Sequence, residues 1–171
     1  MASSKDMHDW GLDLSTARQI SAPDFELLVR NGCKPALGDV LVTKDGANYL
    51  KRIFVLRTDV DVVLLSSIAI LRAGDEISSS LLAASLRTPD TRARLKTFVS
   101  GAAIPRIVLK DFKAFQIVLP PDDLKRRWSR IGEPLDVACF ELGVRAANLR
   151  ATRDLLLPRL LSGELSVEDA P

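Results

Sequence analysis

The last third of the chain carries apolar residues at helical spacing. Between residues 121 and 161 they recur every three or four positions, which predicts one long amphipathic helix. Steps of seven residues collect eight of them into one stripe, hereafter the heptad seam, whose members are Leu124, Trp128, Ile131, Leu135, Ala138, Leu142, Leu149 and Leu156. At about 1.5 Å per residue such a rod is roughly 55 Å long, more than the rest of the chain can cover. We therefore expect the heptad seam to be buried against a helix of another polypeptide.

The first 120 residues show a mixed pattern. Runs rich in Val, Ile and Phe predict strands, and runs with helical spacing behind Ser or Thr caps predict short helices. The predicted elements are a helix over 25–29, strands over 40–43, 52–57, 60–66 and 68–71, helices over 77–86 and 89–99, and a closing strand over 115–119. Pro120 and Pro121 end this pattern. We thus predict an α+β protein: a β-rich globule with short flanking helices over residues 1–120, then a coiled-coil-forming helix within residues 121–171.

Composition narrows the class of protein. The chain has 171 residues, of which 47% are apolar and 27% charged, values typical of a folded soluble protein. No apolar run approaches the ~20 residues that span a bilayer, and the N-terminus lacks a signal-peptide pattern. We therefore expect a cytoplasmic protein that makes no membrane contact. Cys33 and Cys139 are not at metal-ligand spacing and are expected to be free thiols.

Basic residues gather in one part of the chain. Segment 86–113 contains Arg87, Arg92, Arg94, Lys96, Arg106, Lys110 and Lys113, against only Asp90 and Asp111. Such an excess attracts a polyanion such as DNA, but it is equally typical of a solvated helix face.

Little in the sequence favours catalysis. His8 is the only histidine, so a histidine-based triad or a zinc cluster is not expected. The sequence contains no phosphate-binding glycine-rich loop, and we predict no cofactor. One alternative is a small metal-dependent nuclease that uses Asp111 and Lys113, with Asp39, Asp45 or Asp75 as a further carboxylate. Its competing interpretation is a polar turn before the closing strand.

Two short stretches are better candidates for contact with DNA. The first is the predicted strand and turn over 38–46, followed by polar side chains suited to phosphates and base edges: Lys44, Asn48, Lys51 and Arg52. The second is the loop over 100–107, which combines small residues with Ser100 and Arg106. The alternative for the first stretch is an ordinary hairpin tip, and the alternative for the second is a connection fixed by Pro105.

Four stretches in this order resemble the specificity subunit of type I restriction-modification systems. Residues 38–46 are similar to the family's early Gly-Asp-(Ile/Val)-Leu strand and turn, and residues 100–107 to its Ser-Gly-x-x-x-Pro-x-(Ile/Leu) loop. Residues 115–121 resemble the strand that closes a target-recognition domain, with Gln116 and Val118 departing from the commoner residues. Residues 149–165, which contain Arg-Asp-Leu-Leu-Leu-Pro-Arg-Leu-Leu-Ser-Gly-Glu-Leu, resemble the end of the conserved C-terminal helix.

The resemblance implies a subunit that selects the DNA target and has no catalytic activity of its own. Its implied partners are double-stranded DNA, the methyltransferase subunit and, through it, the restriction subunit. A complete family member has two recognition domains and two helices, whereas this chain has one of each. It therefore resembles a half-size subunit that forms a homodimer or pairs with another specificity half, a split-gene half, or a truncated partner that no longer reads DNA.

Because recognition domains of this family vary in sequence, the expected DNA contacts come from charge and loop placement alone. They are Lys44, Asn48, Lys51, Arg52, Arg92, Arg94, Lys96, Ser100, Arg106 and Lys110.

Overall fold

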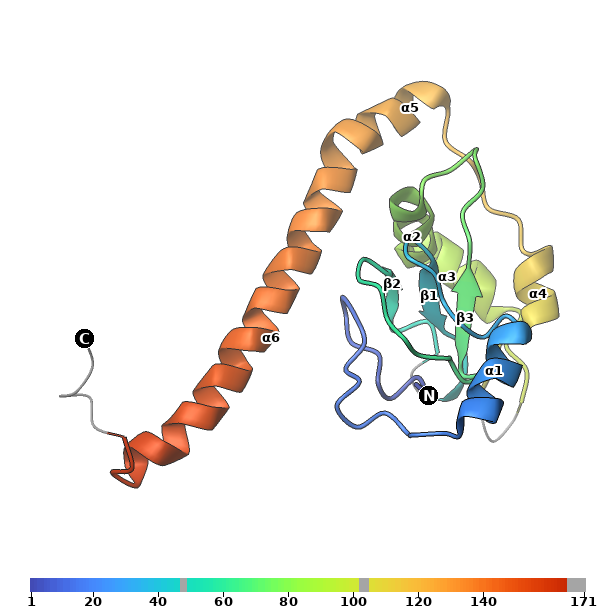
Figure 1. Cartoon of the computed structure of the whole chain (residues 1–171). Coiled ribbons are helices and arrows are strands. Elements are labelled where there is room, and N and C mark those ends of the chain that lie inside the picture. Colours follow the sequence, from blue (N-terminus) through green and yellow to red (C-terminus); the bar gives the residue numbers. More distant parts are fainter. Residues whose placement is uncertain (47–48, 102–104, 166–171) are drawn as a thin grey trace.

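The computed structural model describes residues 1–46, 49–101 and 105–165, and it confirms the α+β class. A three-stranded antiparallel sheet and several helices form the globule, residues 1–120, and a long helix follows (Figure 1). The elements are α1 (Ala22–Arg30), β1 (Val40–Thr43), β2 (Ile53–Val55), β3 (Ile68–Leu71), α2 (Ser79–Arg87), α3 (Pro89–Lys96), α4 (Leu109–Ala114), α5 (Asp122–Arg127), the π-helical turn η2 (Trp128–Gly132) and α6 (Glu133–Leu161).

Strand β1 lies at the centre of the sheet, in the order β2-β1-β3. Leu41 pairs with Phe54 of β2 and with Ile70 of β3. All four residues of β1 are buried, because both faces of the sheet are covered. Val40 therefore points into one core and Leu41 into the other, as the two-residue period of a strand requires.

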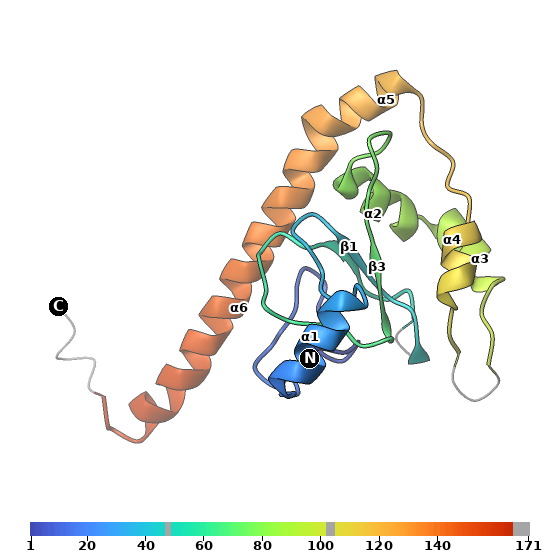
Figure 2. The ribbon, with the colours of Figure 1, turned by 45° about the vertical axis from the view of Figure 1, so that its right-hand side comes forward.

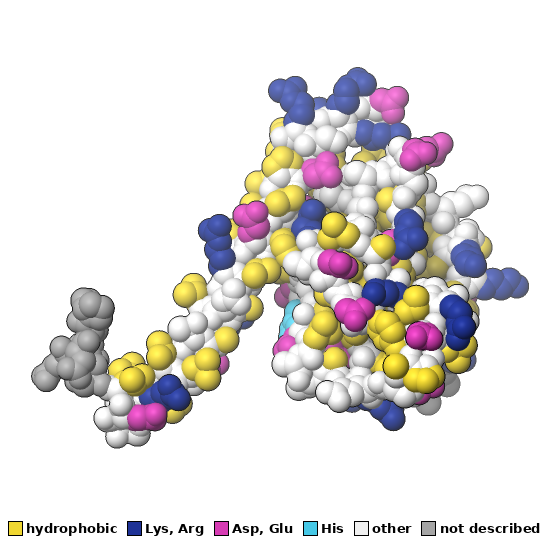
Figure 3. Space-filling view, viewed as in Figure 1, with side chains coloured by type: hydrophobic (Ala, Val, Ile, Leu, Met, Phe, Trp, Pro, Cys, Tyr) yellow, Lys and Arg dark blue, Asp and Glu magenta, His cyan; other side chains and the backbone are white. Residues whose placement is uncertain are grey.

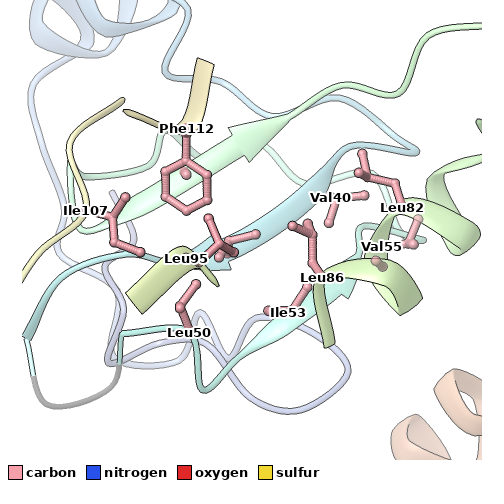
Figure 4. Close-up of a cluster of buried hydrophobic side chains, with 12 residues drawn as sticks. Val40, Leu50, Ile53, Val55, Leu82, Leu86, Leu95, Ile107 and Phe112 are labelled. Atoms are coloured by element: carbon pink, nitrogen blue, oxygen red, sulfur yellow. The ribbon is translucent and has the colours of Figure 1, made fainter. Parts of the chain in front are cut away.

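One face of the sheet packs against the helices. Figure 4 shows side chains of β1 and β2 meeting Leu82 and Leu86 of α2, Leu95 of α3 and Phe112 of α4. The other face is covered by the N-terminal segment, where Ala2 and Met7 are buried. Backbone bonds from Ala2 N to Val63 O (2.9 Å) and from Leu65 N to Ala2 O (2.8 Å) hold this segment in place.

The short helices begin where the capping residues predict. Ser21, Ser78 and Thr88 each accept a hydrogen bond from the backbone N–H three residues later, and thereby start α1, α2 and α3. Gly32, with a φ of 75°, follows α1 in the left-handed conformation that ends many helices.

The predicted strand over 60–66 is wrong. Its residues Val62, Val63 and Leu64 are buried, which explains the apolar run. However, their backbone groups bond to two different segments: Val63 O accepts from Ala2 N, and Leu64 N donates to Cys33 O at 2.8 Å. Leu64 consequently forms only an isolated bridge with Ala2 rather than a ladder.

The predicted closing strand over 115–119 is also wrong. Its alternation is real, since Phe115 and Ile117 pack against the core while Val118 is exposed. What covers this segment is helix α3 instead of a strand: Arg94 Nη2 donates to Gln116 O at 2.7 Å. The two-residue alternation of buried and exposed side chains therefore marks an extended segment that pairs with no described strand.

The predicted long helix is confirmed, with an irregularity that the heptad count does not anticipate. Helices α5, η2 and α6 are contiguous from Asp122 to Leu161, and Figures 1 and 2 show the rod changing direction near α5. In η2 the N–H of Glu133 bonds to Trp128 O, five residues back. Pro134 lies one residue later and cannot donate to a carbonyl, so a widened turn here relieves the contact of its ring with the preceding turn.

Candidate nucleic-acid interface

The two predicted contact stretches lie side by side. Asp45 and Arg106 form an antiparallel bridge. Gly46 N donates to Pro105 O at 2.8 Å, and Ile107 N donates to Lys44 O at 3.0 Å. We call the described parts of 44–52 and 100–106 the loop edge. Stretches some sixty residues apart in sequence are thus adjacent at this edge of the globule.

The loop edge is held in place by its own backbone. Ser100 and Arg106 exchange two hydrogen bonds of 2.9 Å, which close the second loop. In the first loop, Leu50 has a φ of 57°, a conformation that costs a leucine free energy. Its side chain is buried in the core, and its N–H donates to Thr43 O at 2.6 Å. This packing fixes where the neighbouring Lys51 leaves the surface.

Several predicted contact residues are already bound within the protein. The Lys44 side chain is only 8% exposed, and its ammonium group lies 2.9 Å from an Asp45 carboxylate oxygen. Arg52 pairs with Asp9, and Arg94 lies over the Phe115 ring at 5.0 Å while it donates to a backbone carbonyl. Each of these three side chains would therefore have to break a contact within the protein before it could bind a phosphate.

The remaining predicted contact residues differ in accessibility. Arg92 is half-buried, and its Nε has no hydrogen-bond partner within the described part of the chain. Asn48 lies outside the described residues. The exposed members of the predicted set are Lys51, Lys96, Ser100, Arg106 and Lys110. Of these, Lys51, Ser100 and Arg106 belong to the loop edge.

The Gly-Asp-Val-Leu motif has a structural explanation. Gly38 has a φ of 89°, which favours glycine, and Val40 and Leu41 fill the two cores. The buried Asp39 carboxylate accepts two hydrogen bonds of 2.8 Å from Arg72 and one of 2.7 Å from Ala36 N. Burial acts to raise the pKa of Asp39, but these donors outweigh it and hold the pKa below its ordinary value.

The same pair raises the pKa of Arg72, because Asp39 accepts its hydrogen bonds and supplies the opposite charge. Asp39 and Asp45 are thus each engaged by a cation, Arg72 or Lys44. These are two of the carboxylates that the nuclease alternative would need beside Asp111. Within the described residues, no group of three or more His, Cys, Asp or Glu side chains is placed to hold a metal ion.

The heptad seam faces solvent along most of the long helix. Leu142 is 61% exposed, and the other exposed members are Leu124, Ile131, Leu135, Ala138, Leu149 and Leu156. Figure 3 shows apolar side chains along the rod beyond the globule. In Figures 1 and 2 the C-terminal half of α6 stands clear of the globule. This chain therefore leaves the apolar stripe uncovered.

Trp128 departs from that pattern. Its indole is half-buried and lies against Gly132, with Nε1 shielded from solvent. The cause is the π-helical turn, which inserts about one extra residue and so rotates everything before it by about 100°. A count in sevens assumes an uninterrupted helix, so it misplaces this residue.

A second face of the helix, which the sequence did not predict, contacts the globule through Asp136. Its side chain is 7% exposed. One carboxylate oxygen accepts from Arg57 at 2.6 Å and from Ser80 at 3.3 Å, and the other accepts from Arg87 at 3.0 Å. Arg87 is also stacked on Trp10, with its guanidinium 5.1 Å from the ring centre. We call this cluster the Asp136 network.

Comparison with known proteins supports the resemblance over part of the chain. A stretch of 71 residues, 42% of this chain, is 30% identical to the specificity subunit of the type I restriction enzyme MjaIX from Methanocaldococcus jannaschii. The match spans 16% of that protein's length. None of the protein-family models matches this chain.

Two further observations concern the whole described chain. Cys33 and Cys139 are free thiols, the first half-buried and the second exposed. None of the helices that the structure describes combines the length and apolar character needed to cross a bilayer.

Proposed function

We propose that this chain is a DNA-targeting specificity component of a type I restriction-modification assembly. In this proposal the globule reads one half of a split DNA target, and the chain leaves methylation and cleavage to its partners. The partial likeness to a specificity subunit supports the family assignment. The molecule's own geometry supports the division between a reading globule and an exposed rod.

The observation that carries the proposal is the loop edge. The two stretches predicted to contact DNA, the turn after β1 and the loop that begins at Ser100, are bridged through Asp45 and Arg106. Lys51 and Arg106 are exposed on it and available to phosphates, while Ser100 offers a hydroxyl to a base edge or a phosphate. Lys96 and Lys110, both exposed and close in sequence to the second loop, would extend the phosphate footprint.

The rod supplies the partner surface in this proposal. An uncovered leucine stripe on a helix is stabilised by a second helix that buries it. We infer that the heptad seam pairs with the helix of a second copy or of another specificity half, and that the leucine-rich end of α6 docks the methyltransferase subunit. In a symmetric pair, two globules would read a palindromic split site.

A salt titration tests the DNA-reading part. The chain, alone and with its methyltransferase subunit, would be titrated into fluorescein-labelled duplex DNA, with binding followed by anisotropy between low and moderate KCl. Replacing both Lys51 and Arg106 with alanine should weaken binding to all duplexes. It should also reduce the slope of log affinity against log salt by about 1.8, since each phosphate contact contributes about 0.9.

The matched control removes two cations from the rod, at Arg145 and Arg150. This double variant loses the same charge far from the loop edge, so its slope should stay close to that of the wild type. Equal losses in both variants would mean that only the total charge matters, and the loop edge would no longer be the reading surface.

A second candidate is a specificity-subunit partner that no longer reads DNA. It is favoured by the internal engagement of Lys44, Arg52 and Arg94. Such a chain would leave duplex DNA unbound in every arm of the titration, yet would co-sediment with a full-length specificity subunit. The nuclease alternative would instead give magnesium-dependent cleavage that is lost on replacing Asp111 with asparagine.

A further inference from the structure

We propose that Asp136 is a positioning residue that fixes the long helix to the globule in one orientation and one register. Its role in DNA selection rests on the proposed function, because there it sets the distance between the loop edge and whatever covers the heptad seam. The fixed orientation itself is a property of this chain and can be tested without DNA.

The first argument is the kind of group that the helix buries. Among the described residues of α6, Asp136 is the only buried one. Burying a carboxylate removes its hydration, so a buried ion pair gives little net stability compared with an apolar side chain of the same size. Its charge-assisted hydrogen bonds, however, are short and directional. A contact of this kind suits the selection of one geometry better than the strengthening of a core.

The second argument is the origin of the donors. Arg57 follows β2, whereas Ser80 and Arg87 lie at opposite ends of α2. Arg87 is itself fixed, because its Nε donates to Ile53 O at 2.9 Å while Nη1 reaches the carboxylate. The network therefore ties the helix to both the sheet and α2, and a slide of α6 by one turn would break all of these bonds together.

The third argument is a second point of contact seven residues along. At Gly143, an added Cβ would lie 3.0 Å from Cδ1 of Trp10, so the helix backbone and this ring are in close contact. Positions seven apart on an α-helix differ by only about 20° in direction, which places Asp136 and Gly143 on one face. Two points on one face define the axis of the helix, whereas a single contact would leave it free to pivot.

The fixed face leaves the apolar stripe available. Leu135 and Leu142 each precede a contact residue by one position, which turns them by about 100° away from the globule. The helix can therefore be fixed to its own globule and still offer the heptad seam to a partner. Any partner on the seam then stands at a defined position relative to Lys51 and Arg106 on the loop edge.

Pulsed electron paramagnetic resonance distances test the proposal. In a background with Cys33 and Cys139 replaced by serine, nitroxide labels would be placed at Glu76→Cys in the globule and Arg150→Cys on the rod. With the labelled chain diluted in an excess of unlabelled chain, so that only distances within one copy are measured, the unmodified network should give one narrow distance distribution. Asp136→Asn, which keeps the shape and loses the charge, should broaden the distribution and shift its maximum.

Two further variants separate positioning from folding. Arg57→Met removes one donor from the globule side and should broaden the distribution in the same way. Glu141→Gln, which removes the exposed carboxylate that faces Arg145 on the same helix, should leave it narrow. Thermal unfolding of each variant would be recorded in parallel. Because neither core cluster includes Asp136, the globule should still unfold cooperatively in Asp136→Asn.

The outcomes are distinct. Narrow, unshifted distances in both Asp136→Asn and Arg57→Met would overturn the proposal, and a lower melting temperature with unchanged distances would make Asp136 a residue of stability alone. The DNA consequence has its own readout: selection from a randomised duplex library should give one spacer length for the wild type and a spread for Asp136→Asn. If no duplex is selected at all while the distances respond as expected, the proposed function fails and the positioning role stands.

Discussion

Replacing Asp39 with asparagine should destabilise the globule more than any surface substitution. The Asp39 side chain is 2% exposed, and its two oxygens accept three hydrogen bonds from Arg72 and Ala36. Asparagine fits the same volume but offers one acceptor, and its amide N–H₂ would face donors. The substitution therefore isolates the charge and the hydrogen bonds from the packing.

The magnitude follows from those three bonds. A hydrogen bond to a charged group contributes about 1.5–3 kcal/mol, and one donor left unsatisfied adds to the loss. The Arg72 side chain, however, is 68% exposed, so water replaces Asp39 as its partner and screens the pair. We therefore expect a net loss of about 2–3 kcal/mol at neutral pH. Arg72→Met should lose part of the same free energy, since Asp39 keeps its bond from Ala36.

The loss should depend on pH in a defined direction. The folded-state pKa of Asp39 lies below the ordinary value of 3.8, so the folded protein binds the proton less readily than the unfolded chain does. The stability that the carboxylate contributes is therefore complete above the unfolded pKa, and it declines as the pH falls through the folded one. The asparagine side chain of the variant cannot titrate, so the gap between wild type and variant should narrow in acid.

Urea unfolding followed by circular dichroism measures this effect. With a slope of about 2 kcal/mol per molar urea, typical of a small protein, the midpoint should fall by about 1–1.5 M at pH 7. The same experiment at pH 3 should give a smaller difference. A midpoint that does not move at pH 7, or a difference that grows in acid, would refute the role assigned to this carboxylate.

Two further predictions concern the helix. Gly132→Ala should lower the free energy of unfolding by about 1–2 kcal/mol and shift tryptophan emission to the red, because the added Cβ would overlap the Trp128 ring and this overlap outweighs the usual gain of alanine in a helix. Gly74→Ala, where a Cβ meets nothing within 4 Å, is the control. An unshifted emission spectrum in Gly132→Ala would contradict the packing of Trp128 on Gly132. Leu142→Ser should change stability by no more than about 0.5 kcal/mol, because the side chain is exposed. It should nevertheless reduce any self-association in sedimentation, and an equally heavy species would remove Leu142 from the interface.

The helices were predictable because their signals are local. Ser21, Ser78 and Thr88 cap the helices they precede, and each cap depends on residues no more than three positions away. The central strand was predictable for a related reason, since a short apolar run followed by Asp45 and Gly46 reads as a strand and turn in any context.

The two wrong strands depended on distant partners. Segment 60–66 is buried, but its backbone bonds go to Ala2 and Cys33, and segment 115–119 has α3 where a neighbouring strand was expected. An alternating or apolar pattern gives the exposure of a segment, while sheet pairing depends on what the rest of the chain brings beside it. Sequence reasoning of this kind cannot distinguish a strand from an extended segment covered by a helix.

The candidate site divides in the same way. The sequence predicts exposed cations in both contact stretches, and Lys51 and Arg106 are exposed. Lys44 is buried and paired with Asp45 where residues 105–107 lie beside it, an arrangement that a count of charges cannot predict. Asp136 was missed because a lone carboxylate in a leucine-rich helix is usually solvated, and its partners lie some fifty and eighty residues earlier.

The π-helical turn explains how one helix can serve two surfaces. Beyond η2, the residues that face the globule, Asp136 and Gly143, and the residues of the heptad seam, Leu135 and Leu142, follow parallel stripes about 100° apart. The π-helical turn shifts the register by about one residue, so Trp128, its first residue, leaves the seam and is half-buried. Beyond Ile131 the seam keeps Leu135, Ala138, Leu142, Leu149 and Leu156, whereas polar residues take its other later positions: Arg145, Thr152 and Arg159. The globule contacts α6 on the face of Asp136 and Gly143, so the contact within the chain and the surface left for a partner lie on different faces and do not compete.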